Sequence, residues 1–430
     1  MYINKKFHRR NAGEYLAPPP AESETGLQGP RRDFLLFLLA AACLGIMSGI
    51  YENTFNNYLS EIYHISERAR GFLEFPRELP GFLVALFSGL FFFLPGEHLG
   101  VLAIAATGLG LIGQALLAPS YGWVILWMAI YSWGVHIFLP LQSSIGMGLA
   151  EDGRFGRRLG QYQGVNTAAV IVGCLLVWYL FASLKWSYSR SFLFAAAFAF
   201  AAAVSLLLMQ PRRDGTQKTR FVLKRRYTRF YLLNILWGAR KQIFLTFAPW
   251  VLVKIYKQPP TTFATLILVA SVAGVVLQPM LGRAIDHFGE RTIFLWEGWG
   301  IIGICLGYAL AGRIFGGRAL YVLFLCYVID RFLMTVSMAR ATYLRKIVED
   351  PADLTPTLSM GVSIDHFVSM TIPSLGGLLW TYFGYPAVFL AGAAIAVGNL
   401  VVAVAWGLRT TVIPSTSSAR PCSPRAVGRS

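Results

Sequence analysis

The chain has 430 residues, of which 55% are hydrophobic and only 14% are charged, and its mean hydropathy is +0.54. This hydrophobic excess excludes a soluble globular protein. The 38 Lys and Arg outnumber the 21 Asp and Glu, but most of the chain lies in apolar runs, so we do not interpret the net charge of +17 as nucleic-acid binding. Of the five cysteines, Cys43, Cys174, Cys305 and Cys326 lie inside apolar runs, and no spacing predicts a disulfide framework or a metal site.

The chain begins with a polar stretch, residues 1–33, that contains three consecutive prolines and predicts a disordered tail. Twelve apolar segments follow, each long enough to cross a hydrocarbon layer of about 30 Å as a helix. Their approximate ranges are 34–60, 69–93, 99–118, 121–147, 159–182, 187–209, 230–253, 262–281, 292–311, 319–343, 355–380 and 385–408. A basic linker, residues 210–229, divides them into six and six, and residues 409–430 form a second polar tail. The sequence therefore predicts an all-α membrane protein of two six-helix bundles, residues 34–209 and 230–408.

The connections predict the orientation of these segments in the membrane. Lys and Arg are concentrated in both tails, in the linker and in the connections on their side, and they are few in the opposite connections. Because basic connections stay in the cytoplasm, both termini are expected to be cytoplasmic, in a multi-pass protein of the cell (inner) membrane. This sorting leaves eleven ionisable residues inside the segments: Arg77, Arg240, Lys241, Arg331, Arg340, Glu52, Glu74, Glu78, Glu297, Asp330 and Asp365.

An internal repeat relates the two bundles. The pattern Gly49-x-x-x-Asn53-x-Phe55 in the first segment aligns with Gly238-x-x-x-Gln242-x-Phe244 in the seventh. This alignment places Glu52 opposite Lys241. Aligning Gly81 with Gly274 places Glu78 about half-way along the second segment.

A motif follows the eighth segment, where the chain reads Gly282-Arg-Ala-Ile-Asp286-His-Phe-Gly289-Glu-Arg291. It resembles the G-x-x-x-D-x-x-G-x-R loop of the major facilitator superfamily, whose members have twelve spans and a basic central linker. The glycines allow a short turn, Asp286 can face the positive end of a neighbouring helix, and Arg291 can pair locally. The first-half copy departs from this pattern, since Phe93 occupies the position of the aspartate. The resemblance implies a monomer whose halves rock around a solute site near the membrane midplane.

Charges inside a membrane cost about 2.5–3.5 kcal/mol each on insertion scales, so these residues must pair or line water. In the superfamily the first and seventh helices line the central cavity. We therefore expect solute contacts or gating from Glu52, Asn53, Asn56, Trp133, His136, Asn166, Trp237, Arg240, Lys241, Asp330 and Arg331. The alternatives are an ion pair between Glu52 and Lys241 that only joins the halves, and an ordinary core role for His136.

Two further groups of residues are candidates for proton coupling. Glu74, Arg77 and Glu78 lie around Pro76 and Pro80, and they would be outer-end caps if Pro76 started the helix. A buried position instead leaves one carboxylate more than Arg77 can neutralise. Asp365 and His366 lie near the middle of the eleventh segment and can exchange a proton near neutral pH, with structural pairing or direct solute binding as the alternatives. Arg340 is expected to be structural or to reach the membrane surface, and Glu297 to be a surface or pairing residue.

These residues predict a secondary transporter of a small polar solute, such as an organic anion, a zwitterion or a sugar-like molecule, with H⁺ as the coupling ion. No cofactor, metal or nucleic acid is expected, and the bilayer is the only other partner. A proton-driven efflux pump for drugs or an amphipathic metabolite is the alternative within transporters. A membrane enzyme or a sensor is disfavoured, because the sequence contains no nucleophile elbow, metal cluster, phosphate loop or signalling module.

Overall fold

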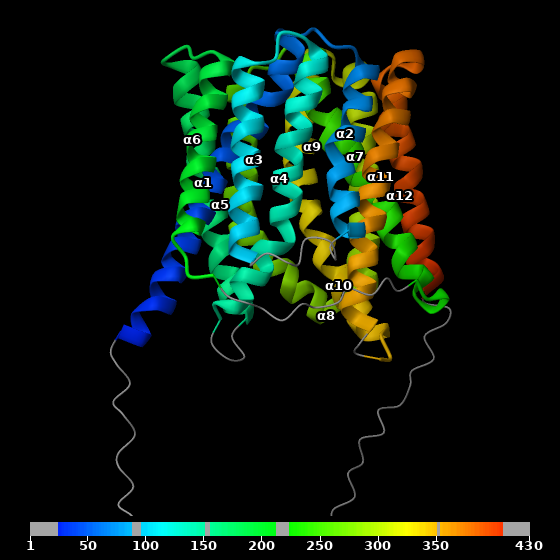
Figure 1. Cartoon of the computed structure of the whole chain (residues 1–430). Coiled ribbons are helices and arrows are strands. Elements are labelled where there is room, and N and C mark those ends of the chain that lie inside the picture. Colours follow the sequence, from blue (N-terminus) through cyan, green and yellow to red (C-terminus); the bar gives the residue numbers. More distant parts are fainter. Residues whose placement is uncertain (1–24, 88–95, 151–154, 212–222, 351–352, 407–430) are drawn as a thin grey trace, which may run out of the picture.

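The computed structural model describes residues 25–87, 96–150, 155–211, 223–350 and 353–406, and within these ranges all regular structure is helical (Figure 1). The helices are α1 (Thr25–Glu61), α2 (Glu67–Phe87), α3 (Gly96–Leu116), α4 (Tyr121–Gly148), α5 (Phe155–Ala182), α6 (Tyr188–Leu207), α7 (Thr228–Lys254), α8 (Pro260–Phe315), α9 (Ala319–Leu333), α10 (Ser337–Ile347), α11 (Leu354–Phe383) and α12 (Tyr385–Trp406). Helix α1 begins at Thr25, inside the polar stretch expected to be disordered. The rest of that tail, most of the linker, the C-terminal tail and the first-half loop with Phe93 lie outside the described residues.

Two helices differ from the expected segments. Helix α8 contains one non-helical residue, Gly289, with φ 78° and ψ 158°, a left-handed conformation that glycine adopts without strain. This break divides α8 into the expected eighth and ninth segments. The tenth segment consists of α9 and α10, joined by the short 3-10 turn Met334–Val336. With α8 counted as two segments and α9–α10 as one, the described chain forms twelve helical segments.

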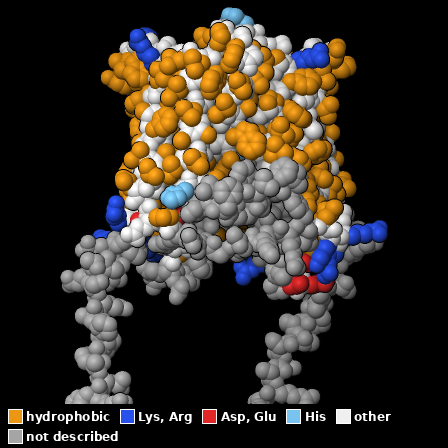
Figure 2. All heavy atoms as spheres, viewed as in Figure 1, with side chains coloured by type: hydrophobic (Ala, Val, Ile, Leu, Met, Phe, Trp, Pro, Cys, Tyr) orange, Lys and Arg blue, Asp and Glu red, His pale blue; other side chains and the backbone are white. Residues whose placement is uncertain are grey.

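On the face seen in Figure 2, the described surface is mostly apolar between the two ends of the bundle, and Lys and Arg lie near those ends. Seven helices in the described part of the chain are long and apolar enough to span a membrane. The remaining segments contain more charged residues, and several of these side chains point into the protein. This distribution explains why composition alone identifies only some of the spans.

The helices pack first within each half. In the first half α1 contacts α5 and α6, and α3 contacts α4 and α6; in the second half α7 contacts α11 and α12, and α8 contacts α9 and α12. The halves meet mainly where α2 packs along α11 and where α5 packs against α8. We call the end of the bundle where α1 starts and α12 finishes the termini end, and the opposite end, which includes residues 61–67 and 255–260, the distal end (Figure 1).

Candidate functional site

The α2 charges form a network buried in the first half. Glu74 is fully buried, and its carboxylate accepts hydrogen bonds from Arg70 Nη1 at 2.5 Å and Arg77 Nη1 at 3.3 Å. Arg70 also donates from Nε to Asn56 Oδ1 at 3.0 Å, and Arg77 pairs with Glu52 at 3.5 Å. Helix α2 begins at Glu67, and Pro76 lies inside it, so the alternative that Glu74, Arg77 and Glu78 cap a helix starting at Pro76 is wrong.

Arg70 also belongs to this network, although it is not among the eleven ionisable residues expected inside the segments. Its side chain is fully buried and lies one helical turn before Glu74. The i, i+4 spacing of an arginine and a glutamate is the signal that could have placed it inside the helix. With Arg70 included, the interior contains six bases and six acids.

Lys241 pairs with Asp365 of α11 rather than with Glu52. The distance from Lys241 Nζ to Asp365 Oδ2 is 2.5 Å, and both side chains are mostly buried. Lys241 also lies over the ring of Trp237, 4.8 Å from its centroid, and Arg340 lies over the same ring at 4.0 Å. Gly238 permits this arrangement, because a Cβ there would lie 2.6 Å from Asp365 Oδ1. Lys241 and Asp365 therefore form a pair within the second half, and the ion pair between Glu52 and Lys241 that was considered as an alternative is not formed.

A second charged cluster lies deeper in the same half. Arg240 Nη2 is 3.4 Å from Asp330 Oδ1, and Arg240 Nη1 is 2.9 Å from the sulfur of Met334. Glu297 is only 2% exposed and interacts electrostatically with Arg240 and Arg340. Both side chains are buried in this cluster. The alternatives that Glu297 lies at the surface and that Arg340 extends to the membrane surface are therefore wrong.

Glu78 lies between two histidines, one from each half. His366 Nδ1 of α11 is 3.1 Å from Glu78 Oε2, and His136 Nε2 of α4 is 3.9 Å from the same oxygen. Ser132 contacts His136 at 3.0 Å and donates to the carbonyl of Arg77. The imidazole rings are 5.0 Å apart and meet edge to face.

Gly81 makes room for the two imidazoles. A Cβ at this position would lie 2.5 Å from His136 Cδ2 and 2.5 Å from His366 Cε1. The three polar atoms of Glu78, His136 and His366 are within 4.8 Å of one another, a spacing that a divalent cation could bridge. The hydrogen bond between Glu78 and His366 already accounts for this packing, so we assign no metal to it.

Arg331 faces a cavity of about 590 Å³ between α5 and α8. Its guanidinium donates to the Tyr327 hydroxyl at 2.9 Å and lies 5.1 Å from the centre of that ring. No carboxylate of the described residues lies within 4.0 Å of it. Arg331 thus forms no ion pair with the described residues, although Asp330 and Glu52 act on it electrostatically at longer range.

Other candidates lie away from these clusters. Asn53 is buried and donates to the Gly49 carbonyl at 2.5 Å, and Asn166 donates to the Ala41 carbonyl at 3.0 Å. Asn166 therefore links α5 to α1, and Asn53 makes a second link through its contact with Cys174 Sγ at 3.4 Å. Trp133 is half-buried on α4, one residue from Ser132. Gln242 is a contact that the prediction missed: its amide donates to Glu74 at 3.0 Å across the halves, and its repeat alignment with Asn53 was the available signal.

The loop motif lies at the termini end. Gly282 is half-buried, Gly289 breaks α8, and Asp286 is exposed, without an ion pair or side-chain hydrogen bond to the described residues. Arg291 donates to the carbonyls of Ala403 and Val404, at 3.3 and 3.4 Å. Arg291 therefore caps the last turn of α12, which is where a cation is favoured at a helix end.

The two halves are bonded together at mid-height and at the distal end. Asn57 donates to the Gln258 carbonyl at 2.8 Å, and Lys254 donates to the Ile65 carbonyl at 3.0 Å. A Cβ at Gly71 would overlap the Pro373 carbonyl, so the backbones of α2 and α11 are in contact there. The Arg331 cavity is reached from the other direction, since Gly160, near the start of α5, lines it. The structure is thus closed at the distal end and hollow toward the termini end.

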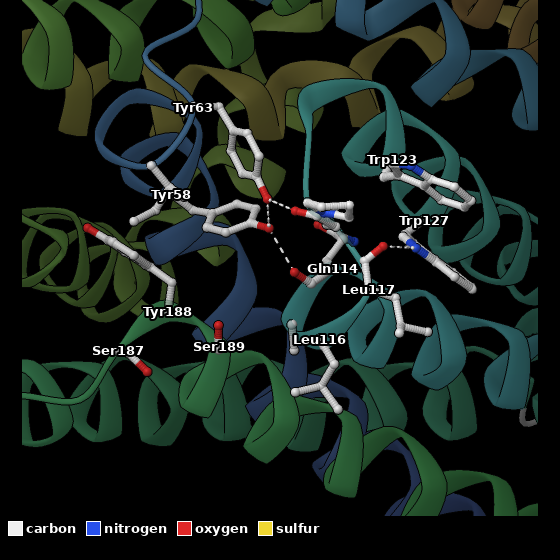
Figure 3. A pocket seen from close by; sticks show the side chains of 14 residues that line it. Tyr58, Tyr63, Gln114, Leu116, Leu117, Trp123, Trp127, Ser187, Tyr188 and Ser189 are labelled. Carbon is white, nitrogen blue, oxygen red and sulfur yellow. Dashed lines mark hydrogen bonds between the residues drawn. The ribbon is translucent and has the colours of Figure 1, made fainter.

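A larger cavity, of about 940 Å³, opens at the surface of the first half near its distal end (Figure 3). Aromatic rings form much of its wall, and the Tyr58 and Tyr63 hydroxyls are 2.9 Å apart. Tyr58 also donates to the Gln114 carbonyl at 2.7 Å. None of the interior ion pairs lines this cavity, so it is separate from the charged centre.

Comparison with known proteins gives one family match. A sequence model of the Major Facilitator Superfamily matches residues 37–358. Among solved structures, a mutant of the nucleoside transporter NupG superposes with a TM-score of 0.72 at 14% identity, covering 87% of this chain and 99% of that one. A bacterial homologue of the human lysosomal transporter Spinster, inward-facing and occupied, gives 0.65 at 16% identity, with coverages of 87% and 95%. These structures share the fold, and no curated protein matches the sequence.

Proposed function

Because the chain belongs to the Major Facilitator Superfamily, we propose that it moves a small polar solute across the cell (inner) membrane by alternating access, coupled to protons. Family membership makes it a multi-pass membrane transporter and not an enzyme. We propose that its moving units are the two six-helix bundles, residues 34–209 and 230–408, that both termini are cytoplasmic, and that it works as a monomer. The closed distal end would then be the outer end.

The observation that carries proton coupling is the hydrogen bond between Glu78 and His366, because it joins the two halves at mid-height. Opening the distal end separates α2 from α11 and breaks this bond. A carboxylate left unpaired inside a membrane costs several kcal/mol, whereas its protonated form is neutral. The distal-open state should therefore bind a proton at Glu78 more tightly than the closed state, and this difference is what couples a proton to the movement.

The surroundings of Glu78 support this role. His136 and His366 face it from α4 and α11, and Arg77 and Lys241 act on it electrostatically from α2 and α7. The arginine and lysine side chains have acidic partners of their own, at 3.5 Å or less. Histidine changes charge near neutral pH, so the proton can pass between Glu78 and an imidazole in the working range of a cell.

We propose that the solute binds in the space between the halves toward the termini end. Arg331, Gln163 and Gln278 line the cavity there; Glu52 is not part of this lining, is half-exposed and pairs with Arg77. This polar wall suits a hydrophilic solute better than the amphipathic drugs of the efflux alternative. NupG is a nucleoside transporter, and nucleosides therefore belong in the panel of test solutes.

The test is uptake by proteoliposomes of a panel of sugars, carboxylates, amino acids, nucleosides and drugs, with and without an imposed pH gradient. The Glu78→Gln variant is expected to lose uphill accumulation and to keep solute exchange at equal pH, since only the proton site is removed. Glu349→Gln, at an exposed carboxylate outside the spans, is the matched control and should accumulate normally. Normal uphill uptake by Glu78→Gln would exclude the proposed coupling site.

A further inference from the structure

The interior charges balance by number, but not all of them are paired. Among the described residues the pairs and their separations are Arg70–Glu74 at 2.5 Å, Arg77–Glu52 at 3.5 Å, Lys241–Asp365 at 2.5 Å and Arg240–Asp330 at 3.4 Å. Glu297 is the acidic neighbour of Arg340. Within the same ranges two further groups lack an oppositely charged Asp, Glu, Lys or Arg partner within 4.0 Å. Glu78 is hydrogen-bonded to His366, and Arg331 donates to the Tyr327 hydroxyl while Asp330 and Glu52 act on it at longer range.

Arg331 lies at a cavity wall and is not paired with the carboxylate next to it in the chain. Its neighbour in the chain, Asp330, points to Arg240 and is almost fully buried there. The bond and ring contact to Tyr327 fix the guanidinium at the wall of the 590 Å³ cavity. A guanidinium has five N–H donors, and one bond to Tyr327 leaves the fork that binds a carboxylate in two places.

The rest of the cavity wall is uncharged and includes polar side chains from several helices. Gln163 and Thr167 contribute from α5, Ser271 and Gln278 from α8, and Thr335 from the turn after α9. No acidic side chain lines the cavity among the described residues. Amide and hydroxyl groups at these positions can bind hydroxyls of a solute, and an anion meets no carboxylate of this wall that would repel it.

We propose that this cavity binds an organic monoanion with hydroxyl groups, its carboxylate on Arg331, and that the protein carries it together with one proton. This inference rests on the proposed function. The anion brings one negative charge to Arg331 and the proton brings one positive charge to the Glu78 cluster, so the loaded and empty forms have the same net charge. Transport is then electroneutral, and its driving force is the pH gradient without a contribution from the membrane potential.

The first experiment compares acids with their neutral amides on the purified protein. D-glucuronate and D-glucuronamide, lactate and lactamide, and nicotinate and nicotinamide are titrated while the thermal midpoint is recorded. At least one acid should bind tenfold or more tightly than its amide, and Arg331→Gln should remove this difference while Arg331→Lys keeps part of it. Arg190→Gln, at an exposed arginine, is the matched control and should bind like the parent protein. Equal binding of every acid and amide, or an unchanged difference in Arg331→Gln, overturns the inference.

The second experiment separates this inference from the proposed function. Uptake of the acid that binds is measured in proteoliposomes with a pH gradient alone and with a valinomycin-induced potassium potential alone. Uptake driven by the pH gradient and unaffected by the potential is the expected result. Potential-driven uptake overturns the one-to-one stoichiometry. Proton-driven uptake of neutral solutes alone overturns the anion site and keeps the proposed function, whereas acid binding without any effect of pH overturns proton coupling and keeps the anion site.

Discussion

Replacing Gly71 with alanine is expected to open the distal end of the bundle. A Cβ at this position would overlap the Pro373 carbonyl oxygen and lie 3.0 Å from Gly377 Cα, against 3.4–4 Å for an ordinary contact. Both neighbours are backbone, so no side chain can rotate away and α2 must separate from α11. Overpacking of this kind costs about 1–3 kcal/mol. The strain is relieved when the halves part, so the ratio of distal-open to distal-closed protein should rise about 5-fold to 150-fold.

Spin labels at the distal end measure this shift. Cysteines replacing Trp123, at the start of α4, and Tyr321, near the start of α9, are exposed and belong to different halves. The distance distribution between the labels, measured by pulsed electron–electron double resonance, should gain a longer component in Gly71→Ala. Gly164→Ala is the matched control, because a Cβ there meets no atom within 4 Å. The same distance distribution in both variants would show that the contact of α2 with α11 does not hold the distal end closed.

Two further predictions concern ion pairs. Lys241→Met or Asp365→Asn alone should lower the thermal midpoint more than the two changes together, because a single change leaves a mostly buried charged group without its partner. A double variant that is less stable than either single variant would contradict this prediction. At the termini end, hydrogen bonds from Lys224 and Tyr227 lower the pKa of Asp353. This carboxylate therefore stabilises the fold fully above its unfolded pKa of about 3.9. The stabilisation is lost as the pH falls through the lower pKa of the folded state. In Asp353→Asn the thermal midpoint should therefore decrease less steeply below about pH 4 than in the parent protein. An equally steep decrease in both proteins would show that Asp353 does not carry this pH dependence.

Local sequence determined the spans. Apolar runs of sufficient length must form helices in a membrane, because every backbone polar group has to be bonded within the segment. The same reasoning, with the motif between Gly282 and Arg291, correctly predicted the family and the all-helical fold. The break inside α8 also lies where the motif places a glycine, at Gly289.

The list of interior charges was also readable from sequence, with one exception. Arg70 lies close to the expected start of a span, where apolar content alone does not distinguish the first turns of a helix from a connection. Its burial depends on α2 packing against neighbouring helices, which supply Asn56 and cover Glu74. Hydropathy is a property of one segment and does not contain this information.

Only the tertiary structure decided which charges meet. The repeat placed Glu52 opposite Lys241, but the rotation of α7 turns Lys241 toward Asp365, and the rotation of α2 turns Arg77 toward Glu52. Partners on different helices depend on the axial rotation and depth of each helix, and a rotation of one residue, about 100°, exchanges one partner for another. The sequence by itself thus determined a transporter fold with a charged interior, and the packing of the helices left Arg331 facing a cavity where no carboxylate of the described residues pairs with it.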